Sequence, residues 1–305
     1  MDNNSHKHSY KSGVISIVGK TNVGKSTLLN NILDEKVSIV TDRVQTTRNL
    51  IRAIYTSNEG QLVFLDTPGI HKAEGNLGRN MNKVARSSLD GVDIALIIFD
   101  VSSTPNQLDE GWFRRICKSE IECIFILNKI DCKSSLENEY KNLWYKIKNE
   151  KKANINPEWL KISALKNIGL DNLIKKLIEI VPAGPKLFPD NVLTDYPRKL
   201  NIADVIREKL FFKLHQELPH ALAVWVDTIE ELEKKCNVCA IIYVERHSQK
   251  GIVIGEKGRI IKAVKKEAEK ELYEMYAMKY NLKLIIKVEK NWKKNFWMLK
   301  KLGYS

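Results

Sequence analysis

Eight consecutive residues near the start of the chain have the composition of a loop that binds phosphate groups. The run Gly19-Lys20-Thr21-Asn22-Val23-Gly24-Lys25-Ser26 matches the pattern G-x-x-x-x-G-K-[ST] at each fixed position. Glycines let backbone N–H groups surround phosphate oxygens, the lysine neutralises them, and the serine hydroxyl is a ligand that Mg²⁺ accepts. We therefore expect this run and Thr27 to bind a nucleoside triphosphate, with Lys25 as a catalytic group and Ser26 as a Mg²⁺ ligand.

A second polar motif, Asp66-Thr67-Pro68-Gly69, directly follows an apolar stretch at 62–65. An aspartate after such a strand can hold Mg²⁺ through a water molecule, and the backbone N–H of Gly69 can contact a γ-phosphate. We therefore expect all four residues to contact the nucleotide, with Asp66 as a second metal-binding residue and Gly69 as a second catalytic group.

The tetrapeptide Asn128-Lys129-Ile130-Asp131 predicts which base is bound. The Asp131 carboxylate can accept hydrogen bonds from both the N1–H and the exocyclic amine of guanine, whereas adenine would leave it unpaired at a cost. Lys129 is expected to pack its aliphatic stem along the base, beside Asn128. The tripeptide Ser163-Ala164-Leu165 would supply a backbone N–H for the guanine carbonyl oxygen. The predicted nucleotides are therefore GTP and GDP.

Each motif follows a short apolar run that is typical of a buried parallel strand. Segments with helical spacing separate these runs, so that strands and helices alternate. This order predicts a doubly wound, mostly parallel α/β sheet, in which ligands bind at the carboxyl ends of the strands. The expected strands are 14–18, 62–65, 94–99, 123–127 and 159–162, and the expected helices are 26–33, 108–117, 136–149 and 170–181.

Two segments stand outside this pattern. Residues 1–12 are polar and lack the apolar core of a secretory signal, which indicates a disordered tail. Residues 183–200 are rich in proline and predict a linker between a domain at 13–182 and a smaller α+β domain at 201–305. The expected helices of the second domain are 202–218, 259–280 and 292–302, and its expected strands are 222–229, 238–244 and 282–288.

Positive charge is concentrated near the end of the chain. The whole chain carries a net +13, and from Ser248 to Ser305 there are 15 Lys and Arg residues against 6 Asp and Glu residues, a net of +9. Such an excess indicates a polyanionic partner. Within this segment residues 251–261 resemble the core of a KH domain, with a Gly-x-x-Gly loop at 255–258 before a basic helix, and the resemblance implies a loop that clamps about four nucleotides of a single strand. The expected RNA-binding residues are Ile254, Gly255, Glu256, Lys257, Gly258, Arg259 and Lys262.

The motifs, in this order, closely resemble those of the Era family of GTPases. The resemblance is carried by the phosphate loop, Gln45-Thr46-Thr47-Arg48, the sequence DTPGI at 66–70 and NKID at 128–131, and the segment 251–261 resembles the core of a KH domain. It implies a Ras-like GTPase domain followed by a KH-type domain, Mg²⁺-dependent hydrolysis of GTP, and binding to the 3′ end of small-subunit ribosomal RNA in an assembling small subunit. It also implies a switch-I threonine on Mg²⁺. We expect this metal-binding and catalytic residue to be Thr47, with Thr46 as the alternative.

One position departs from the pattern of Ras-like GTPases. Such enzymes place a glutamine after the DxxG motif to orient the attacking water, and here Ile70 takes its place. We therefore expect slow intrinsic turnover. Asn22 resembles an asparagine that helps related GTPases bind K⁺ near the phosphates, which would neutralise charge in the transition state.

The remaining chemistry-bearing residues are interpreted as structural. The five cysteines are scattered, which favours reduced thiols in the cytoplasm, and the pair Cys236 and Cys239 has no partners at zinc-ligand spacing. The aromatic residues of the last two helices are expected to pack in the core rather than to stack on bases: Tyr273, Tyr276, Tyr280, Trp292, Phe296 and Trp297. For the last three, the neighbouring lysines leave a peripheral contact with RNA or lipid as the alternative.

The resemblance favours a ribosome-assembly GTPase, which we expect to be a monomer, and three other classes of function are alternatives to it. A peripheral membrane-associated signalling module would use the basic C-terminus on anionic lipid without a specific RNA target. An RNA-modifying enzyme would need a second catalytic constellation, and a P-loop kinase would have no use for the NKID motif.

Overall fold

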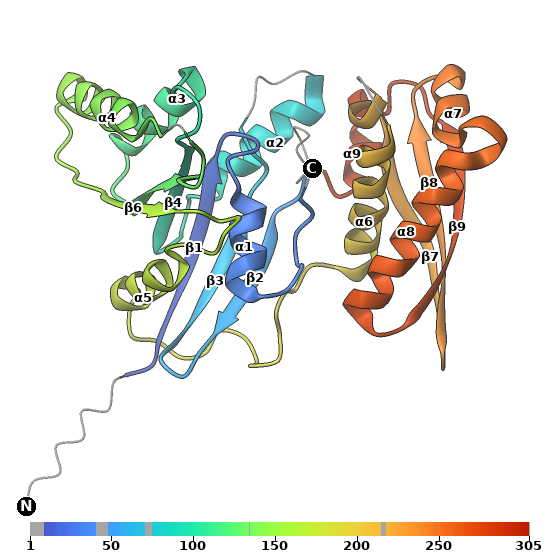
Figure 1. Ribbon diagram of the computed structural model, residues 1–305, viewed down its shortest axis with the longest axis horizontal. Helices are drawn as coiled ribbons and strands as arrows, with labels where there is room; N and C mark the ends of the chain where they lie inside the picture. The colour runs from blue at the N-terminus through green and yellow to red at the C-terminus, as the bar shows by residue number, and fades with distance from the viewer. Residues whose placement is uncertain (1–8, 41–47, 71–74, 134, 215–217, 305) are drawn as a thin grey trace, which may run out of the picture. The chain divides into compact units, whose positions relative to one another are not determined.

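The computed structural model describes residues 9–40, 48–70, 75–133, 135–214 and 218–304. Its contacts divide the chain into two compact units. The first, here called the N-terminal unit, comprises residues 1–38, 50–71 and 82–195. The second, the C-terminal unit, comprises residues 196–305 together with 39–49 and 72–81. Figure 1 shows the elements of both units.

Six strands of the described residues form the sheet of the N-terminal unit, in the order β2-β3-β1-β4-β5-β6. All neighbouring strands are parallel except β2, which pairs antiparallel with β3 at one edge. The strands are β1 (Lys11–Gly19), β2 (Ile51–Thr56), β3 (Gly60–Asp66), β4 (Ile94–Asp100), β5 (Glu122–Asn128) and β6 (Glu158–Ile162). The doubly wound, mostly parallel sheet predicted from the sequence is therefore confirmed.

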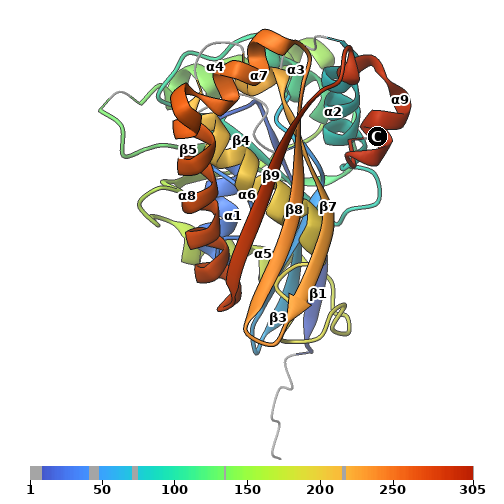
Figure 2. The same cartoon turned by 90° about the vertical axis from the view of Figure 1, so that its right-hand side faces the viewer.

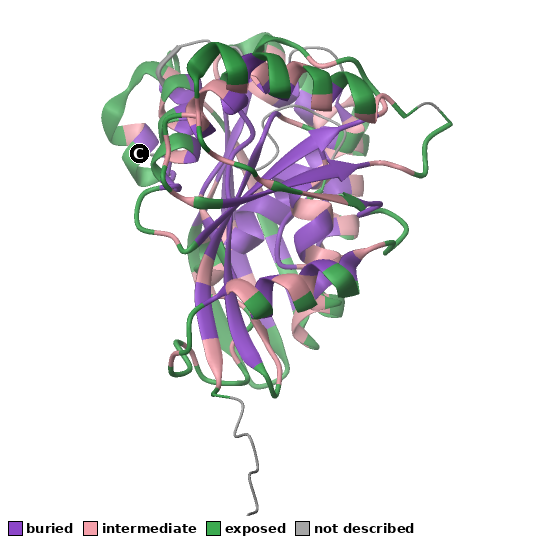
Figure 3. Cartoon of the chain, turned by 90° about the vertical axis from the view of Figure 1, so that its left-hand side faces the viewer, coloured by how far each residue is buried: buried purple, intermediate pink, exposed green. Residues whose placement is uncertain are grey.

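Helices cover both faces of this sheet and bury two apolar clusters. One cluster joins alternate strand residues such as Ile17 and Ile126 to α1 (Lys25–Leu33) and α5 (Leu170–Ile180). The other joins the opposite strand face, including Phe125, to α2 (Gly75–Ser87), α3 (Gln107–Ile116) and α4 (Glu137–Lys151). In Figure 3 the strands are coloured as buried over most of their length, because both faces are covered.

The sequence did not predict β2 or α2. Strand β2 is an edge strand that exposes Arg52, so its sequence lacks the continuous apolar run of the inner strands. Strand β1 begins at Lys11, inside the segment expected to be a disordered tail, because Lys11 pairs with Gly60 of β3. Residues 1–8 of that tail lie outside the described residues.

The C-terminal unit is built on a three-stranded sheet with the order β7-β8-β9. β7 (Ala223–Leu232) pairs antiparallel with β8 (Lys235–Val244), and β8 pairs parallel with β9 (Lys279–Val288). The helices are α6 (Arg198–Lys213), α7 (His247–Ile254), α8 (Arg259–Tyr276) and α9 (Phe296–Lys301), with short 3₁₀ turns at 218–221, 256–258 and 292–294. Figure 2 looks onto this sheet, with its three strands side by side.

The two faces of this sheet bury different clusters. Val238, Ala240 and Ile242 of β8 pack with apolar residues of α6 and α8, whereas the alternate residues Ile241 and Tyr243 pack with the chain end. This alternation is the period-two pattern of a strand that is covered on both sides. No helix among the described residues is long and apolar enough to cross a bilayer.

Several expected boundaries in this unit were wrong. Helix α6 begins within the expected linker and ends at Lys213 rather than Leu218, and helix α8 ends at Tyr276 because Ala277 takes a left-handed conformation before β9 starts. Helix α7 was not predicted, since Gly251 within it weakens the helical pattern.

The expectation for the aromatic residues was correct only in part. Trp292 is fully buried and its indole N–H donates to the Ala221 carbonyl oxygen at 3.0 Å, and Tyr280 is buried. Tyr273, Phe296 and Trp297 are instead 57%, 59% and 73% exposed, so the prediction that they pack in the core was wrong. Helix α9 is short. Leu299 near its end, and Leu302 after it, belong to the apolar cluster at the chain end, whereas its first two residues, Phe296 and Trp297, do not.

Candidate nucleotide and RNA sites

The phosphate-loop sequence forms the turn between β1 and α1, at the carboxyl edge of the sheet. Helix α1 starts at Lys25, so its first-turn N–H groups and positive dipole end lie at this turn. Lys25 is 6% exposed, and its ammonium donates to the carbonyl oxygen of Lys20 at 2.9 Å. The loop therefore holds its lysine with its own backbone, within reach of any phosphate group bound there.

Asp66 is the centre of a buried cluster of oxygen atoms. Its Oδ2 accepts hydrogen bonds from the hydroxyl groups of Ser26 and Ser38, each at 2.8 Å, and the side chain is fully buried. Its Oδ1 has no hydrogen-bond partner. Carboxylate and hydroxyl oxygens are the ligands that Mg²⁺ prefers, and an unpaired buried carboxylate oxygen is costly without a cation. The donor set and the unpaired oxygen thus fit Mg²⁺.

Burial shifts the pKa of both charged groups in this cluster. Burial lowers the pKa of Lys25 to about 8, against the opposing effect of Asp66. Burial also raises the pKa of Asp66, which Lys25 and the two serine hydroxyls partly oppose. Because the folded-state pKa of Lys25 lies below its ordinary value of 10.5, holding the charged lysine costs stability below pH 8, and the cost disappears as the pH rises toward 10.5. An arriving phosphate would remove this cost.

Asn128 connects the three loops that follow β1, β5 and β6. Its Nδ2 donates to the Val23 carbonyl oxygen of the phosphate loop at 2.6 Å, and its Oδ1 accepts from the Ala164 N–H at 2.9 Å. The side chain is 2% exposed. Asn31 of α1 also donates to the Ala164 carbonyl oxygen. Asn128 therefore fixes the base-reading loop against the phosphate loop rather than projecting toward a base.

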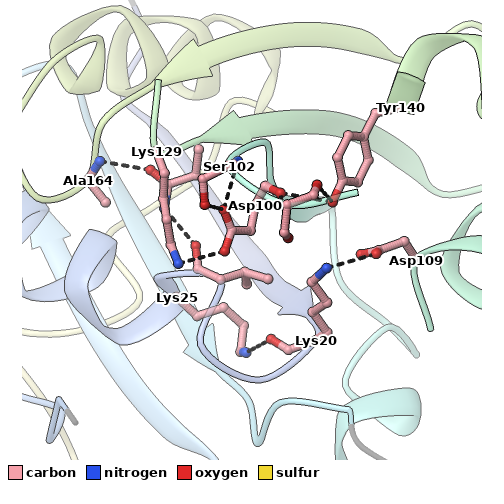
Figure 4. Close-up of polar contacts among 11 residues, drawn as sticks. Lys20, Lys25, Asp100, Ser102, Asp109, Lys129, Tyr140 and Ala164 are labelled. Atoms are coloured by element: carbon pink, nitrogen blue, oxygen red, sulfur yellow. Dashed lines mark hydrogen bonds and ion pairs between the residues drawn. The ribbon is translucent and has the colours of Figure 1, made fainter. Parts of the chain in front are cut away.

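Asp131 and Lys129 are each held by one further side chain. The Ser163 hydroxyl donates to Asp131 Oδ1 at 2.6 Å, which orients the exposed carboxylate. The Lys129 ammonium donates to Asp100 Oδ2 at 2.6 Å, so its stem is stretched across the loop (Figure 4). Burial raises the pKa of Asp100, but hydrogen bonds from Lys129 and Ser102 outweigh this and the net pKa is lowered.

Some residues expected to contact the nucleotide direct their side chains elsewhere. The Thr67 hydroxyl donates to the Ile17 carbonyl oxygen at 2.8 Å, and Val23 packs in the apolar core. The Lys20 ammonium donates to Asp109 of α3 at 2.9 Å. These three residues can therefore offer a nucleotide only their backbone. One backbone N–H of the tripeptide at 163–165 was expected to donate to the guanine carbonyl, and that of Ala164 already donates to Asn128.

The sequence did not single out Ser38, Asp100 or Asp109, although each contacts a predicted site residue. Asp100 ends an apolar strand in the same way as Asp66, and that signal could have identified it. Ser38 and Asp109 occupy loop and helix positions without a recognisable pattern.

The stretch expected to contain switch I is described only at its end, because residues 41–47 lie outside the described residues, and Thr46 and Thr47 with them. Arg48 belongs by its contacts to the C-terminal unit. It is 2% exposed, its Nη1 donates to the Leu222 carbonyl oxygen at 3.1 Å, and its guanidinium lies 5.3 Å from the centre of the Tyr304 ring. Burial lowers the pKa of Arg48.

The Gly-x-x-Gly loop lies between α7 and α8, as the resemblance to a KH domain implied. Gly258 has a φ of 76° and Lys257 a φ of 49°, so the loop makes a left-handed turn directly before α8. Glu256, Lys257, Arg259 and Lys262 are exposed, whereas Val264 is buried in the core. The loop thus presents a basic, accessible surface at the start of a helix, which suits a phosphodiester backbone.

Comparison with protein families divides the chain in the same way as the motifs. Residues 14–129 match the family described as 50S ribosome-binding GTPase, and residues 217–293 match the KH domain family. The chain is 40% identical over 298 residues to GTPase Era of Clostridioides difficile, which covers 97% of this chain and 99% of that protein. It is 38% identical over 300 residues to GTPase Era of Alkaliphilus metalliredigens, covering 97% and 100%.

Two solved structures are similar over nearly the full length. A crystal structure of Era in complex with MgGDPNP and nucleotides 1506–1542 of 16S ribosomal RNA superposes with a TM-score of 0.90 at 34% identity, covering 97% of this chain and 99% of that one. An Aquifex aeolicus Era variant bound to GDP and AlF4⁻ gives a TM-score of 0.89, with the same identity and coverage.

We predict that nucleotide affinity falls as the pH rises through about 8. The free protein loses the Lys25 proton near this pH, and binding must then take up a proton, because phosphate stabilises the ammonium form. From pH 8 to 9 the Kd for GDP is expected to rise by up to about tenfold. Isothermal titration calorimetry in two buffers of different ionisation enthalpy measures both the Kd and the proton uptake. The variant Lys25→Met is the control, because any change in its Kd with pH comes from titration of other groups, guanine included. If the Kd of the wild type changed with pH no more than that of the variant, the prediction would be wrong.

Proposed function

This chain belongs to the Era family of GTPases, and from that premise we propose that it is a GTP-hydrolysing switch that binds small-subunit ribosomal RNA and assists assembly of the small ribosomal subunit. The observation that carries the proposal is the coexistence, in one chain, of a phosphate-loop site joined to a guanine-reading loop and a basic Gly-x-x-Gly loop. The relative solved with a GTP analogue and a segment of 16S ribosomal RNA supports both the nucleotide-binding and the RNA-binding part of the proposal.

The nucleotide half of the proposal assigns roles to the residues at the carboxyl edge of the N-terminal sheet. Lys25 binds the β- and γ-phosphates, and the phosphate-loop backbone from Gly19 to Thr27 surrounds them. Asp131, oriented by Ser163, reads the guanine edge. Mg²⁺ supplies positive charge that offsets the charge of the phosphates, and Ser26, Asp66 and the switch-I threonine at 47 would hold it.

Hydrolysis in this site depends on positioning more than on proton transfer by the protein. In the proposed mechanism Lys25 holds a positive charge where negative charge develops on the γ-phosphate, and the Gly69 N–H would donate to the same group. Ile70 is 8% exposed and offers no side-chain hydrogen bond to a water molecule. The proposed enzyme is therefore slow on its own.

The RNA half rests on charge and loop geometry in the C-terminal unit. The expected contacts are Ile254 to Arg259 and Lys262, at the start of α8. The backbone turn lets a nucleic-acid strand approach closely, and the exposed Arg259 and Lys262 neutralise its phosphates. Single-stranded RNA at the 3′ end of the small-subunit RNA is the proposed target.

The GTP-bound state is proposed to favour RNA binding, with hydrolysis releasing the RNA. Arg48 comes directly after Thr47 in the sequence, and it is buried within the C-terminal unit. This supports a link from switch I to the RNA-binding unit that does not need the proline-rich linker.

The protein is proposed to act as a cytoplasmic monomer, and its scattered cysteines suit a reducing compartment. The alternative function, peripheral attachment to an anionic membrane, gains some support from helix α9. Phe296 and Trp297 are exposed there, beside basic residues. Steep, salt-dependent liposome binding without RNA preference would favour that alternative over the assembly role.

We further propose that K⁺ assists hydrolysis through Asn22. Asn22 is an exposed residue of the phosphate loop with a φ of 62°, and a monovalent cation beside it would offset negative charge that develops in the transition state. Single-turnover hydrolysis is expected to be at least about tenfold faster in K⁺ than in Na⁺ at equal ionic strength. Asn22→Ala should remove the difference, and equal wild-type rates in the two salts would refute the role of K⁺.

The RNA assignment is tested by Gly258→Asp. The substitution puts a carboxylate and a β-carbon at a left-handed position in the loop that meets the phosphates, so RNA affinity should fall by about tenfold or more. The Kd for GTP should stay within about twofold. Fluorescence anisotropy with a 3′-terminal small-subunit RNA measures the first, with Gly251→Asp on exposed α7 as the matched control. Unchanged RNA binding by Gly258→Asp would mean that the loop is not the RNA clamp.

A further inference from the structure

Lys20 makes a buried ion pair that no nucleotide motif requires. Its ammonium lies 2.9 Å from Asp109 Oδ2, and the two side chains are 11% and 1% exposed. Asp109 belongs to the first turn of α3 and also accepts the Asn106 N–H at 3.0 Å, which closes a capping box. The pair thus joins the second residue of the phosphate loop to the start of a helix 89 positions away in sequence (Figure 4).

The backbone around Lys20 contacts both groups that are proposed to meet the γ-phosphate. The Lys20 carbonyl oxygen accepts the Lys25 ammonium at 2.9 Å. On either side of Lys20, the Gly19 carbonyl oxygen accepts the Ile70 N–H at 3.1 Å and the Thr21 N–H donates to the Ile70 carbonyl oxygen at 3.2 Å. Ile70 directly follows Gly69, whose position is so close to the loop that a β-carbon there would lie 2.7 Å from Thr21 Cα. The Lys20 peptide therefore sets where Lys25 and Gly69 lie.

The ion pair is poorly suited to a purely stabilising role. Removing two charges from water is costly, and buried pairs can often be replaced by neutral groups without loss of stability. Here the second carboxylate oxygen, Asp109 Oδ1, is buried and has no hydrogen-bond partner, which adds to the cost. A costly pair that fixes one peptide at the centre of a phosphate site points to a role in geometry.

We propose that Lys20 and Asp109 are positioning residues for GTP hydrolysis: their ion pair anchors the first turn of the phosphate loop on α3, so that Lys25 and Gly69 are correctly placed at the γ-phosphate. The inference rests on the proposed GTPase activity. It assigns the pair mainly to hydrolysis at the γ-phosphate, which both Lys25 and Gly69 are proposed to meet. The end of the loop has a separate hydrogen bond, from Asn128 to Val23.

The test uses the neutral double variant Lys20→Met/Asp109→Asn, which removes both charges and keeps an oxygen to accept the Asn106 N–H. Single-turnover kcat should fall by about tenfold, because small displacements of reacting groups are costly in rate. The Kd for GDP should rise by much less, about threefold at most, because attraction of Lys25 to the β-phosphate depends less steeply on position than the reaction does. The Tm should be unchanged or higher. The single variant Asp109→Asn, in which the amide oxygen can still accept from Lys20, should show a smaller loss of kcat.

Arg114→Met is the matched control on the same helix. It removes an ion pair with Glu150 on the protein surface, and neither residue has a hydrogen bond or ion pair with the phosphate loop among the described contacts. Its kcat should equal that of the wild type. An unchanged kcat in the double variant would overturn the proposal, and so would parallel losses in kcat, GDP affinity and Tm, which indicate general disruption. Wild-type protein is assayed alongside, and a wild type without GTPase activity would instead contradict the proposed function.

Discussion

The nucleotide site depends on one buried amide. Asn128 donates to the phosphate loop through Val23 and accepts from the loop after β6 through Ala164, while its own backbone begins the base-reading loop. A parallel sheet brings the carboxyl ends of β1, β5 and β6 to the same edge but does not fix the loops that leave them. An amide can donate and accept at once, and with 2% exposure it has little access to competing water. Phosphate recognition and base recognition are therefore parts of one rigid arrangement.

Around this amide the protein holds charges that are costly without a nucleotide. Burial lowers the pKa of Lys25, which Asp66 opposes in part, and the Lys20 carbonyl oxygen accepts the Lys25 ammonium. Asp66 itself keeps one oxygen unpaired. These groups are kept in place by two apolar clusters that pack helices on both faces of the sheet. The nucleotide site is thus preorganised, and binding of phosphate and Mg²⁺ would relieve the cost of holding these buried charges. In the C-terminal unit the Gly-x-x-Gly loop is supported in a similar way, since Val264 and its neighbours anchor α8 in the core.

The sequence predicted the parts of this arrangement that depend on local pattern. Continuous apolar runs identified the inner strands, and the motifs after them identified the loops, because a buried parallel strand leaves few choices of residue. Edge strand β2 and helix α7 were missed, since Arg52 and Gly251 interrupt their patterns. The side-chain contacts that fix the nucleotide site also could not be predicted from the sequence. Lys20 and Asp109 meet only after folding, and the partners of Asn128 and Lys129 come from other strands. Phe296 and Trp297 were expected to be buried but are exposed, because apolar composition alone does not reveal which residues pack into the core.

The central claim is that Asp131 selects guanine by accepting two hydrogen bonds from its edge, in a loop that Asn128 and Ser163 hold in position. The most direct measurement is competition for a fluorescent GDP analogue by GTP, ATP and xanthosine triphosphate, on the wild type and on Asp131→Asn. Xanthine carries a carbonyl where guanine carries its amine, so an asparagine can donate to it. The account predicts that wild type prefers GTP by at least about a hundredfold and that Asp131→Asn prefers xanthosine triphosphate. Displacement by ATP as effective as by GTP, or an Asp131→Asn variant that still prefers GTP, would contradict it.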